Sequence, residues 1–219
     1  MEPTPFSTVD AIKEGWRVVK REPAVLIALT VLQLAVLSAQ TGEPPGTRSG
    51  LAQLVAHTAG AALAVGWWRV ALRANEGREV SLAALTELST LELLRYFVTQ
   101  AIMALVIVTG LVLLIVPGLY IGARWMLAPV VVVDEGRDPV AALRRSWELT
   151  EGASGRMVVF AIALVALNLL GLLALGVGVL VTMPTSVLAT VHVYRCLTAR
   201  TTSEPPFAEL PRAHATVTP

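Results

Sequence analysis

Long apolar runs alternate with short polar stretches along this chain, and the apolar runs match the thickness of a lipid bilayer. A bilayer core of about 30 Å needs roughly 20 helical residues to cross it, and backbone groups inside lipid must bond within their own segment. The pattern therefore predicts an all-α integral membrane protein with about six transmembrane helices arranged as three hairpins. The predicted spans are residues 24–40, 51–72, 97–116, 117–133, 157–183 and 184–197, within one polytopic domain over residues 1–197. Residues 198–219 are polar and rich in proline, which predicts a disordered cytoplasmic tail.

An amphipathic stretch precedes each pair of spans, over residues 7–22, 81–94 and 138–150. Apolar residues at helical spacing predict three helices that lie at the cytoplasmic surface of the membrane. Ser7 and Asp10 form a capping box at the start of the first, and Asp138 with Pro139 begins the third. The predicted apolar faces are Ile12, Trp16 and Val19 in the first stretch and Val140, Leu143 and Trp147 in the third.

These stretches also indicate an internal repeat. The sequence AIKEGW at residues 11–16 resembles ALRRSW at residues 142–147. One unit is an interfacial helix followed by a helical hairpin, and the three units would be parallel repeats about an axis along the membrane normal. The alternative is that polar linkers in membrane proteins commonly form amphipathic helices with tryptophan at the interface.

Composition and charge exclude several classes of function and site. The chain has 219 residues, of which 55% are hydrophobic and 15% charged, and a net charge of +1 gives no basic field for nucleic acid. Its one cysteine, Cys196, excludes an internal disulfide and a CxxC site. The first apolar run is expected to remain as a span rather than a cleaved signal, because acidic residues precede it and Leu37 does not suit a cleavage site.

Basic residues gather on one side of the predicted spans. On that side lie Lys13, Arg17, Lys20, Arg21, Arg69, Arg73, Arg78, Arg95, Arg137, Arg144, Arg145, Arg156, Arg195, Arg200 and Arg212, whereas the opposite loops carry only Arg48. The positive-inside rule then places both termini in the cytoplasm. Fifteen of the 17 basic residues are arginine, which is typical of a GC-rich bacterial genome. We therefore expect a multi-pass protein of the bacterial inner membrane.

The stretch of residues 117–157 contains a Pro-Gly pair, an apolar span ending in Ala-Pro-Val-Val, an acidic residue, and a helix with Ala, Arg, Ser and Trp. The matching residues are Pro117, Gly118, Ala128, Pro129, Val130, Val131, Asp134, Ala142, Arg145, Ser146 and Trp147. This pattern resembles the YciC type of bacterial inner-membrane proteins, a family related to the membrane domain of some glycerophosphodiester phosphodiesterases. The resemblance covers about a fifth of the chain. It implies a six-helix membrane protein without catalytic residues, because the phosphodiesterase activity belongs to a separate barrel of about 250 residues.

Arg124 is the most costly residue in the predicted spans, since a charge at the bilayer centre costs about 2.5 to 3.5 kcal/mol. We expect its long side chain to snorkel to the outer boundary. The alternatives are a buried contact with a polar group such as Asn168, or a charge that binds substrate. Asn168 itself is expected to make an interhelical hydrogen bond.

Glycines within the spans favour close helix packing, at Gly118 and Gly122 and at Gly171, Gly176 and Gly178. The alternative is a hinge or broken helix at a transport site, with a kink near Gly176. His57 and His192 have no third ligand in the sequence around them and are expected to be packed or pore-facing, so no metal or other cofactor is predicted.

The basic residues Lys13, Arg17, Lys20, Arg144 and Arg145 form either an ordinary cytoplasmic surface or a site for anionic lipid headgroups. Each basic residue near an anionic leaflet contributes about 1 kcal/mol of attraction. The partners we expect are the lipid bilayer and either another membrane protein or a second copy of this chain.

The sequence has no HExxH, G-x-S-x-G, P-loop or dinucleotide motif in a suitable setting, and we predict no catalytic residues. Asp134 and Glu135 are expected to lie in a solvated turn. The leading hypothesis is a non-enzymatic scaffold, assembly factor or lipid-interacting accessory protein. One alternative is a small transporter or channel subunit with a midplane polar site. A third is a lipid-processing enzyme that uses Asp134, Glu135 and Arg145.

Overall fold

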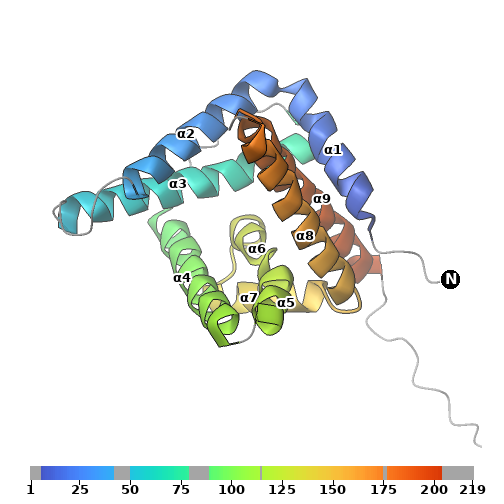
Figure 1. Cartoon of the computed structure of the whole chain (residues 1–219). Helices are drawn as coiled ribbons and strands as arrows, with labels where there is room; N and C mark the ends of the chain where they lie inside the picture. The colour runs from blue at the N-terminus through green and yellow to red at the C-terminus, as the bar shows by residue number, and fades with distance from the viewer. Residues whose placement is uncertain (1–5, 42–49, 79–88, 114, 175–176, 204–219) are drawn as a thin grey trace, which may run out of the picture.

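The structure, a computed structural model, describes residues 6–41, 50–78, 89–113, 115–174 and 177–203 (Figure 1). Over these ranges the chain consists of helices and short connections, with no strand, which confirms the predicted all-α fold. The helices are α1 Thr8–Arg21, α2 Pro23–Thr41, α3 Gly50–Asn75, α4 Thr90–Leu113, α5 Ile115–Trp125, α6 Ala128–Glu135, α7 Pro139–Leu149, α8 Ser154–Leu173 and α9 Val179–Ser203.

Four segments of the described chain are long and apolar enough to cross a membrane. They are Pro23–Gln40 in α2, Thr90–Val112 in α4, Val116–Glu135 across α5 and α6, and Ser154–Leu173 in α8. They overlap the first, third, fourth and fifth predicted spans and are compatible with a multi-pass membrane protein. The other two predicted spans lie in α3 and α9, which are helical but less apolar. Gln53 and His57 lower the hydropathy of α3, and His192 and Arg195 lower that of α9.

The predicted fourth span, residues 117–133, is broken in two. α5 ends at Trp125 and α6 begins at Ala128, with Pro129 in the first turn of α6. A proline ring clashes with the carbonyl four residues earlier, here that of Trp125, and offers no N–H to it. The predicted turn at Pro117 and Gly118 also lies elsewhere, because both residues are already inside α5.

Three further predicted boundaries need correction. α8 ends at Leu173 and α9 begins at Val179, so the break between these helices falls near Gly178, where a kink is predicted, and Pro184 lies inside α9. At the start of α4 and the end of α9, the chain is helical over more residues than predicted. α4 runs unbroken from Thr90 through the end of the predicted interfacial stretch 81–94, whose residues 81–88 lie outside the described residues. α9 continues to Ser203 into the predicted tail, of which 204–219 lie outside the described residues.

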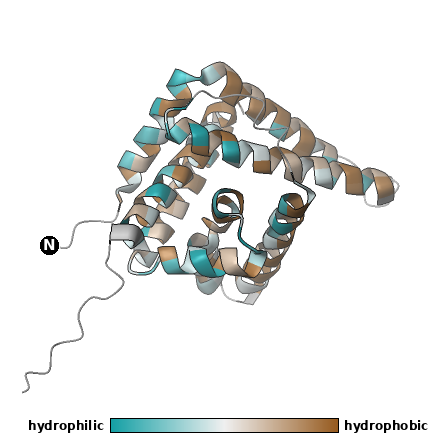
Figure 2. Ribbon diagram, turned by 180° about the vertical axis from the view of Figure 1, so that it is seen from behind, coloured by the Kyte–Doolittle hydropathy of each residue, from teal (hydrophilic) through white to brown (hydrophobic). Residues whose placement is uncertain are grey.

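The core lies around α6, which packs against α3, α4 and α7. α6 buries Ala128 to Val132, and the same buried cluster includes residues from the C-terminal half of α3 and from the middle of α9. α6 lies inside the ring of longer helices in Figure 1. The far ends of α2 and α3 extend away from this core and carry mostly apolar residues (Figure 2), among them the exposed Leu51, Leu54 and Val55. Apolar residues exposed in this way suit contact with lipid.

Glycines bring neighbouring helices into close contact. A Cβ atom on Gly118 of α5 would lie 2.6 Å from the backbone nitrogen of Leu111 in α4, and one on Gly178 would lie 2.6 Å from the carbonyl oxygen of Gly171. Gly60 of α3 instead lies against the end of the Gln40 side chain of α2, which is flexible and can move. The predicted packing role of Gly118, Gly171 and Gly178 is therefore confirmed, whereas Gly122 makes only ordinary contact with Ile107 and Gly176 lies outside the described residues.

The first and third amphipathic helices form as predicted and bury equivalent positions. Adding 131 to a residue number in α1 gives its counterpart in α7, so that Ala11 corresponds to Ala142 and Gly15 to Ser146. These four residues are buried, and the two helices begin after the equivalent residues Ser7 and Asp138. The shared pattern supports the predicted internal repeat.

The predicted apolar faces of these helices are buried only in part. Val19 and Leu143 are buried, but Trp16, Trp147 and Val140 are exposed. Small residues make the contacts instead, because they let another helix approach closely. A Cβ on Gly15 would lie 2.5 Å from the Thr185 carbonyl oxygen of α9. The contact of α1 with α9 joins the two ends of the described chain, so the helices close into a ring (Figure 1).

Candidate functional site

Arg124 lies at the C-terminal end of α5 and holds that helix to α7. Its Nη2 donates to the carbonyl oxygen of Trp147 at 2.6 Å, and its Nε donates to the Thr150 hydroxyl at 3.1 Å. The guanidinium stacks on the Trp147 ring, 3.7 Å from the centroid. In return, the Ser146 hydroxyl donates to the Arg124 carbonyl oxygen at 2.6 Å. That carbonyl is free because Ala128 and Pro129 begin a new helix.

The expectation that Arg124 snorkels is therefore wrong. The side chain is only 6% exposed, and protein groups of α7 cover it. Nor does it meet Asn168, whose Nδ2 donates to the Leu164 carbonyl and to the Ser186 hydroxyl, both at 2.8 Å. That second bond joins α8 to α9 and matches the predicted interhelical hydrogen bond. Arg124 and Asn168 thus both connect helices.

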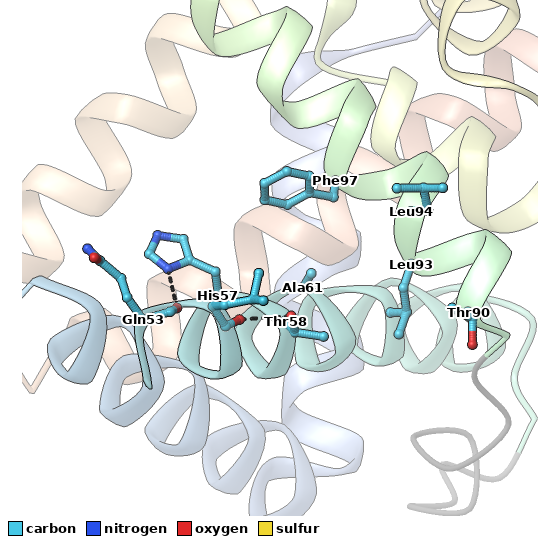
Figure 3. Close-up of a pocket in the computed structure, with 9 residues that line it drawn as sticks. Gln53, His57, Thr58, Ala61, Thr90, Leu93, Leu94 and Phe97 are labelled. Atoms are coloured by element: carbon cyan, nitrogen blue, oxygen red, sulfur yellow. Dashed lines mark hydrogen bonds between the residues drawn. The ribbon is translucent and has the colours of Figure 1, made fainter. Parts of the chain in front are cut away.

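Two large apolar cavities lie elsewhere in the molecule. One, of about 650 Å³, is lined by α8, α9 and Met126, and Asn168 and Ser186 are its polar residues. The other, of about 540 Å³, is a groove between α3 and α4 in which His57 and Phe97 project into the same space (Figure 3). His57 is exposed rather than packed, and its Nδ1 donates to the Gln53 carbonyl at 2.8 Å.

The histidines form no metal site in the part of the chain that the structure describes. Within it, no group of three or more His, Cys, Asp or Glu residues could hold a metal ion. The His192 Nε2 and the Cys196 Sγ are 3.5 Å apart on one face of α9.

The predicted headgroup residues do not form a single site. Lys13, Arg17 and Lys20 are exposed along α1, with Lys20 over the Trp16 ring at 5.2 Å and Arg17 paired with Glu14. On α7, Arg144 is exposed and pairs with Glu148 at 3.2 Å. Arg145 instead turns inward, to Glu135 at 3.4 Å.

The densest polar cluster lies at the C-terminal end of α6. The Tyr194 hydroxyl of α9 donates to Asp134 at 2.6 Å and lies 3.2 Å from a Glu135 oxygen. Arg195 pairs with Asp134 at 3.5 Å and also with Glu76 at the end of α3. The expected solvated turn at Asp134 and Glu135 is therefore wrong. Both carboxylates belong to α6, and α9 holds them in place.

More arginines surround this cluster. Arg137 and Arg145 both pair with Glu135, and Arg95 of α4 pairs with Asp138 at 3.0 Å. Arg69 of α3 pairs with Glu92 of α4. Helices from all three predicted units are thus joined by ion pairs at one end of the molecule.

Two cavities open beside the cluster. The larger, of about 390 Å³, lies between α4 and α6 and includes Glu92, Arg95 and Glu135 in its lining. The smaller, of about 190 Å³, lies between the ends of α3, α6 and α9. Its charged lining residues are Arg69, Arg73, Glu76, Arg78, Asp134 and Arg195.

Sequence reasoning missed most of this cluster. It identified Asp134, Glu135 and Arg145, but not Tyr194, Arg195 or Glu76 as their neighbours. Asp134 and Tyr194 are separated by 60 residues along the chain. The sequence feature that could have predicted the cluster is position, since each of these residues lies near the end of a predicted span on the side that carries the positive charge.

Comparisons with protein-family models, with curated proteins and with solved structures find no match to this chain.

Proposed function

We propose that the chain is a multi-pass protein of the bacterial inner membrane, with six spans in three hairpins and both termini in the cytoplasm. The arginines that the positive-inside rule assigns to the cytoplasm support this arrangement, because Arg69, Arg95, Arg145 and Arg195 gather around one polar cluster. The contacts of α2 with α3, of α4 with α5 and of α8 with α9 support the hairpins. The resemblance to the YciC type agrees with this topology and is part of the same proposal.

Within that membrane the protein acts as a non-enzymatic scaffold or lipid-interacting accessory. The observation that carries this proposal is that the Arg124 guanidinium and the Asn168 Nδ2 make hydrogen bonds to neighbouring helices. A transporter would instead direct such groups into a polar cavity near the midplane. The cavity beside Asn168 is apolar over most of its lining. The exposed basic residues of α1, with Trp16 beside Lys20, favour contact with anionic lipid.

The lipid-processing alternative is less well supported by the geometry. Asp134 and Glu135 line cavities, but Tyr194 and arginines already hold both carboxylates, which disfavours either one as a general base. The hydrogen bonds and ion pairs of Asp134 and Glu135 stabilise the C-terminal end of α6.

Native mass spectrometry of the protein, extracted gently with its own lipids, tests the proposed function. We expect a protein partner or an anionic lipid to remain bound at fixed stoichiometry. A variant with Lys13, Arg17 and Lys20 changed to glutamine should lose affinity for vesicles of anionic lipid, whereas one with Arg156 changed should not. A lipid-free monomer that moves solute across reconstituted vesicles would overturn the scaffold proposal in favour of transport.

A further inference from the structure

The groove of about 540 Å³ between α3 and α4 has a polar end that none of the roles above requires. His57 and Gln53 lie together at that end (Figure 3). The apolar walls come from both helices and are formed by Leu54, Ala61, Leu93, Leu94 and Phe97. The volume falls within the range of about 300–1,000 Å³ that is common for small-molecule sites, which are mostly apolar and carry a few polar groups.

His57 presents one ring nitrogen to this groove. Its Nδ1 donates to the Gln53 carbonyl oxygen at 2.8 Å, and because a carbonyl oxygen only accepts, this bond places a proton on Nδ1. Nε2 has no hydrogen-bond partner among the described residues. An ionisable side chain within a membrane span marks a functional site and calls for a partner, and His57 lies in the proposed second span. We therefore look for a ligand group that bonds to Nε2.

The Gln53 side chain supplies a second polar group beside His57. The two residues are four apart, so they are neighbours on the surface of α3, and Figure 3 shows both side chains on the same side of that helix. The Gln53 amide is exposed, carries two N–H donors, and has no partner among the described residues. Two adjacent groups of this kind suit a ligand head with two oxygen atoms.

A carboxyl group fits His57 in either protonation state of the ring. A neutral imidazole accepts the acid O–H at Nε2, and an imidazolium donates from Nε2 to the carboxylate, while Gln53 donates to the other oxygen. No lysine or arginine is among the described residues that line the groove. A phosphate would keep its charge in these apolar surroundings without an offsetting cation, whereas a carboxyl group can share a proton with the imidazole.

We propose that this groove binds a fatty acid, with the carboxyl group at His57 and Gln53 and the chain along Leu93, Leu94 and Phe97. Lipid chains are as apolar as leucine, so contact with the chain gives little selectivity and the head decides which lipid binds. This inference rests on the proposed lipid-interacting role and names the class of lipid, but it does not depend on the basic residues of α1.

Thermal unfolding of the full chain in a mild non-ionic detergent tests the groove. The additions are oleic acid and methyl oleate, which lacks the O–H, at equal mole fractions in the micelles. We expect oleic acid to raise the unfolding temperature to a plateau and methyl oleate to leave it unchanged. His57→Phe keeps a ring but removes Nε2, and it should raise the half-saturating fraction of oleic acid by about tenfold, the value of one hydrogen bond to a charged group. Gln53→Leu should raise it by about threefold.

Gln100→Leu is the matched control for Gln53→Leu, because it makes the same change at an exposed position of α4 that does not line the groove. Its titration should follow that of the wild type. His57 and Gln53 are both exposed and bond to no other side chain among the described residues, so their variants should fold as the wild type does.

Each outcome has one meaning. Equal stabilisation by the acid and the ester would overturn the role of the polar end, since only the chain would then be recognised. Absence of stabilisation by oleic acid overturns the site, as does a titration that His57→Phe leaves unchanged. A second copy or another protein that leaves the complex on addition of oleic acid, seen by native mass spectrometry, would assign the groove to a protein instead.

The same measurements separate this site from the proposed function. An oleic acid titration that depends on His57, in a protein whose vesicle binding ignores the substitutions in α1, would keep the groove and reject the role proposed for α1. Loss of vesicle binding in the α1 variant without any effect of oleic acid would keep the lipid-interacting role and reject the groove.

Discussion

At the scale of single residues, Arg124 is the side chain whose loss we expect to matter most. Arg124→Leu leaves the Trp147 carbonyl without its donor and removes the stacking on the Trp147 ring, so it should lower the free energy of unfolding by about 1–3 kcal/mol. Thermal unfolding in detergent measures the effect. Arg144→Leu, at an exposed position of α7, should change stability by no more than about 0.5 kcal/mol. Equal stability of the two variants would contradict the role assigned to Arg124.

The same residue shows what a sequence reveals at this scale. Its cost in a membrane can be predicted from its depth in the span. The capping of α1 by Ser7, whose hydroxyl accepts from the Asp10 N–H at 3.4 Å, can be predicted from residue spacing. The partner of Arg124 is not visible, because it is a backbone carbonyl on another helix, 23 residues away. Any residue type can supply that acceptor. A local hydrogen bond can therefore be predicted from spacing, whereas a long-range bond to the backbone cannot.

At the scale of helices, the glycine contacts make a matched pair of predictions. Gly118→Ala places a Cβ 2.6 Å from a backbone nitrogen of α4, which must move away, at a cost of about 1–3 kcal/mol. Gly155→Ala, inside α8, has open space around the added carbon and should stabilise the helix by up to about 1 kcal/mol. Unfolding temperatures of the two variants should therefore shift in opposite directions. A neutral Gly118→Ala would mean that α4 and α5 are not in close contact.

Helix boundaries could be predicted only where local chemistry determines them. The start of α7 after Asp138 follows from its Asp-Pro sequence, and the break near Gly178 follows from its glycines. The break at Trp125 was missed, although Pro129 signals it, because the apolar run through Val130 to Val133 reads as one continuous span. Hydropathy measures the mean polarity of a segment and does not detect a missing hydrogen bond within it.

At the scale of the whole molecule, the repeat is the feature that connects sequence to site. The match between residues 11–16 and 142–147 correctly identifies two equivalent helices, α1 and α7. It does not show that α1 packs on α9 and closes the ring, because that contact depends on the order in which the units are arranged. The site brings together Glu76 after α3, Asp134 of α6 and Arg195 of α9, which are far apart along the chain. This is why its individual charges could be predicted to share one side, but not to form one cluster.

The proposed orientation makes a prediction for the whole chain. In a Cys196→Ser background, a cysteine at Arg48 should react with a membrane-impermeant maleimide in intact spheroplasts, and one at Arg78 only after the membrane is opened. Arg78 is suited to this because it is 70% exposed, and the arginines that remain on its side keep the charge asymmetry that sets orientation. Labelling of both positions from outside would mean that α2 and α3 do not cross as a pair. Arg78 also lines the cavity of about 190 Å³ beside Asp134, so that result would place this cavity on the outer side of the membrane.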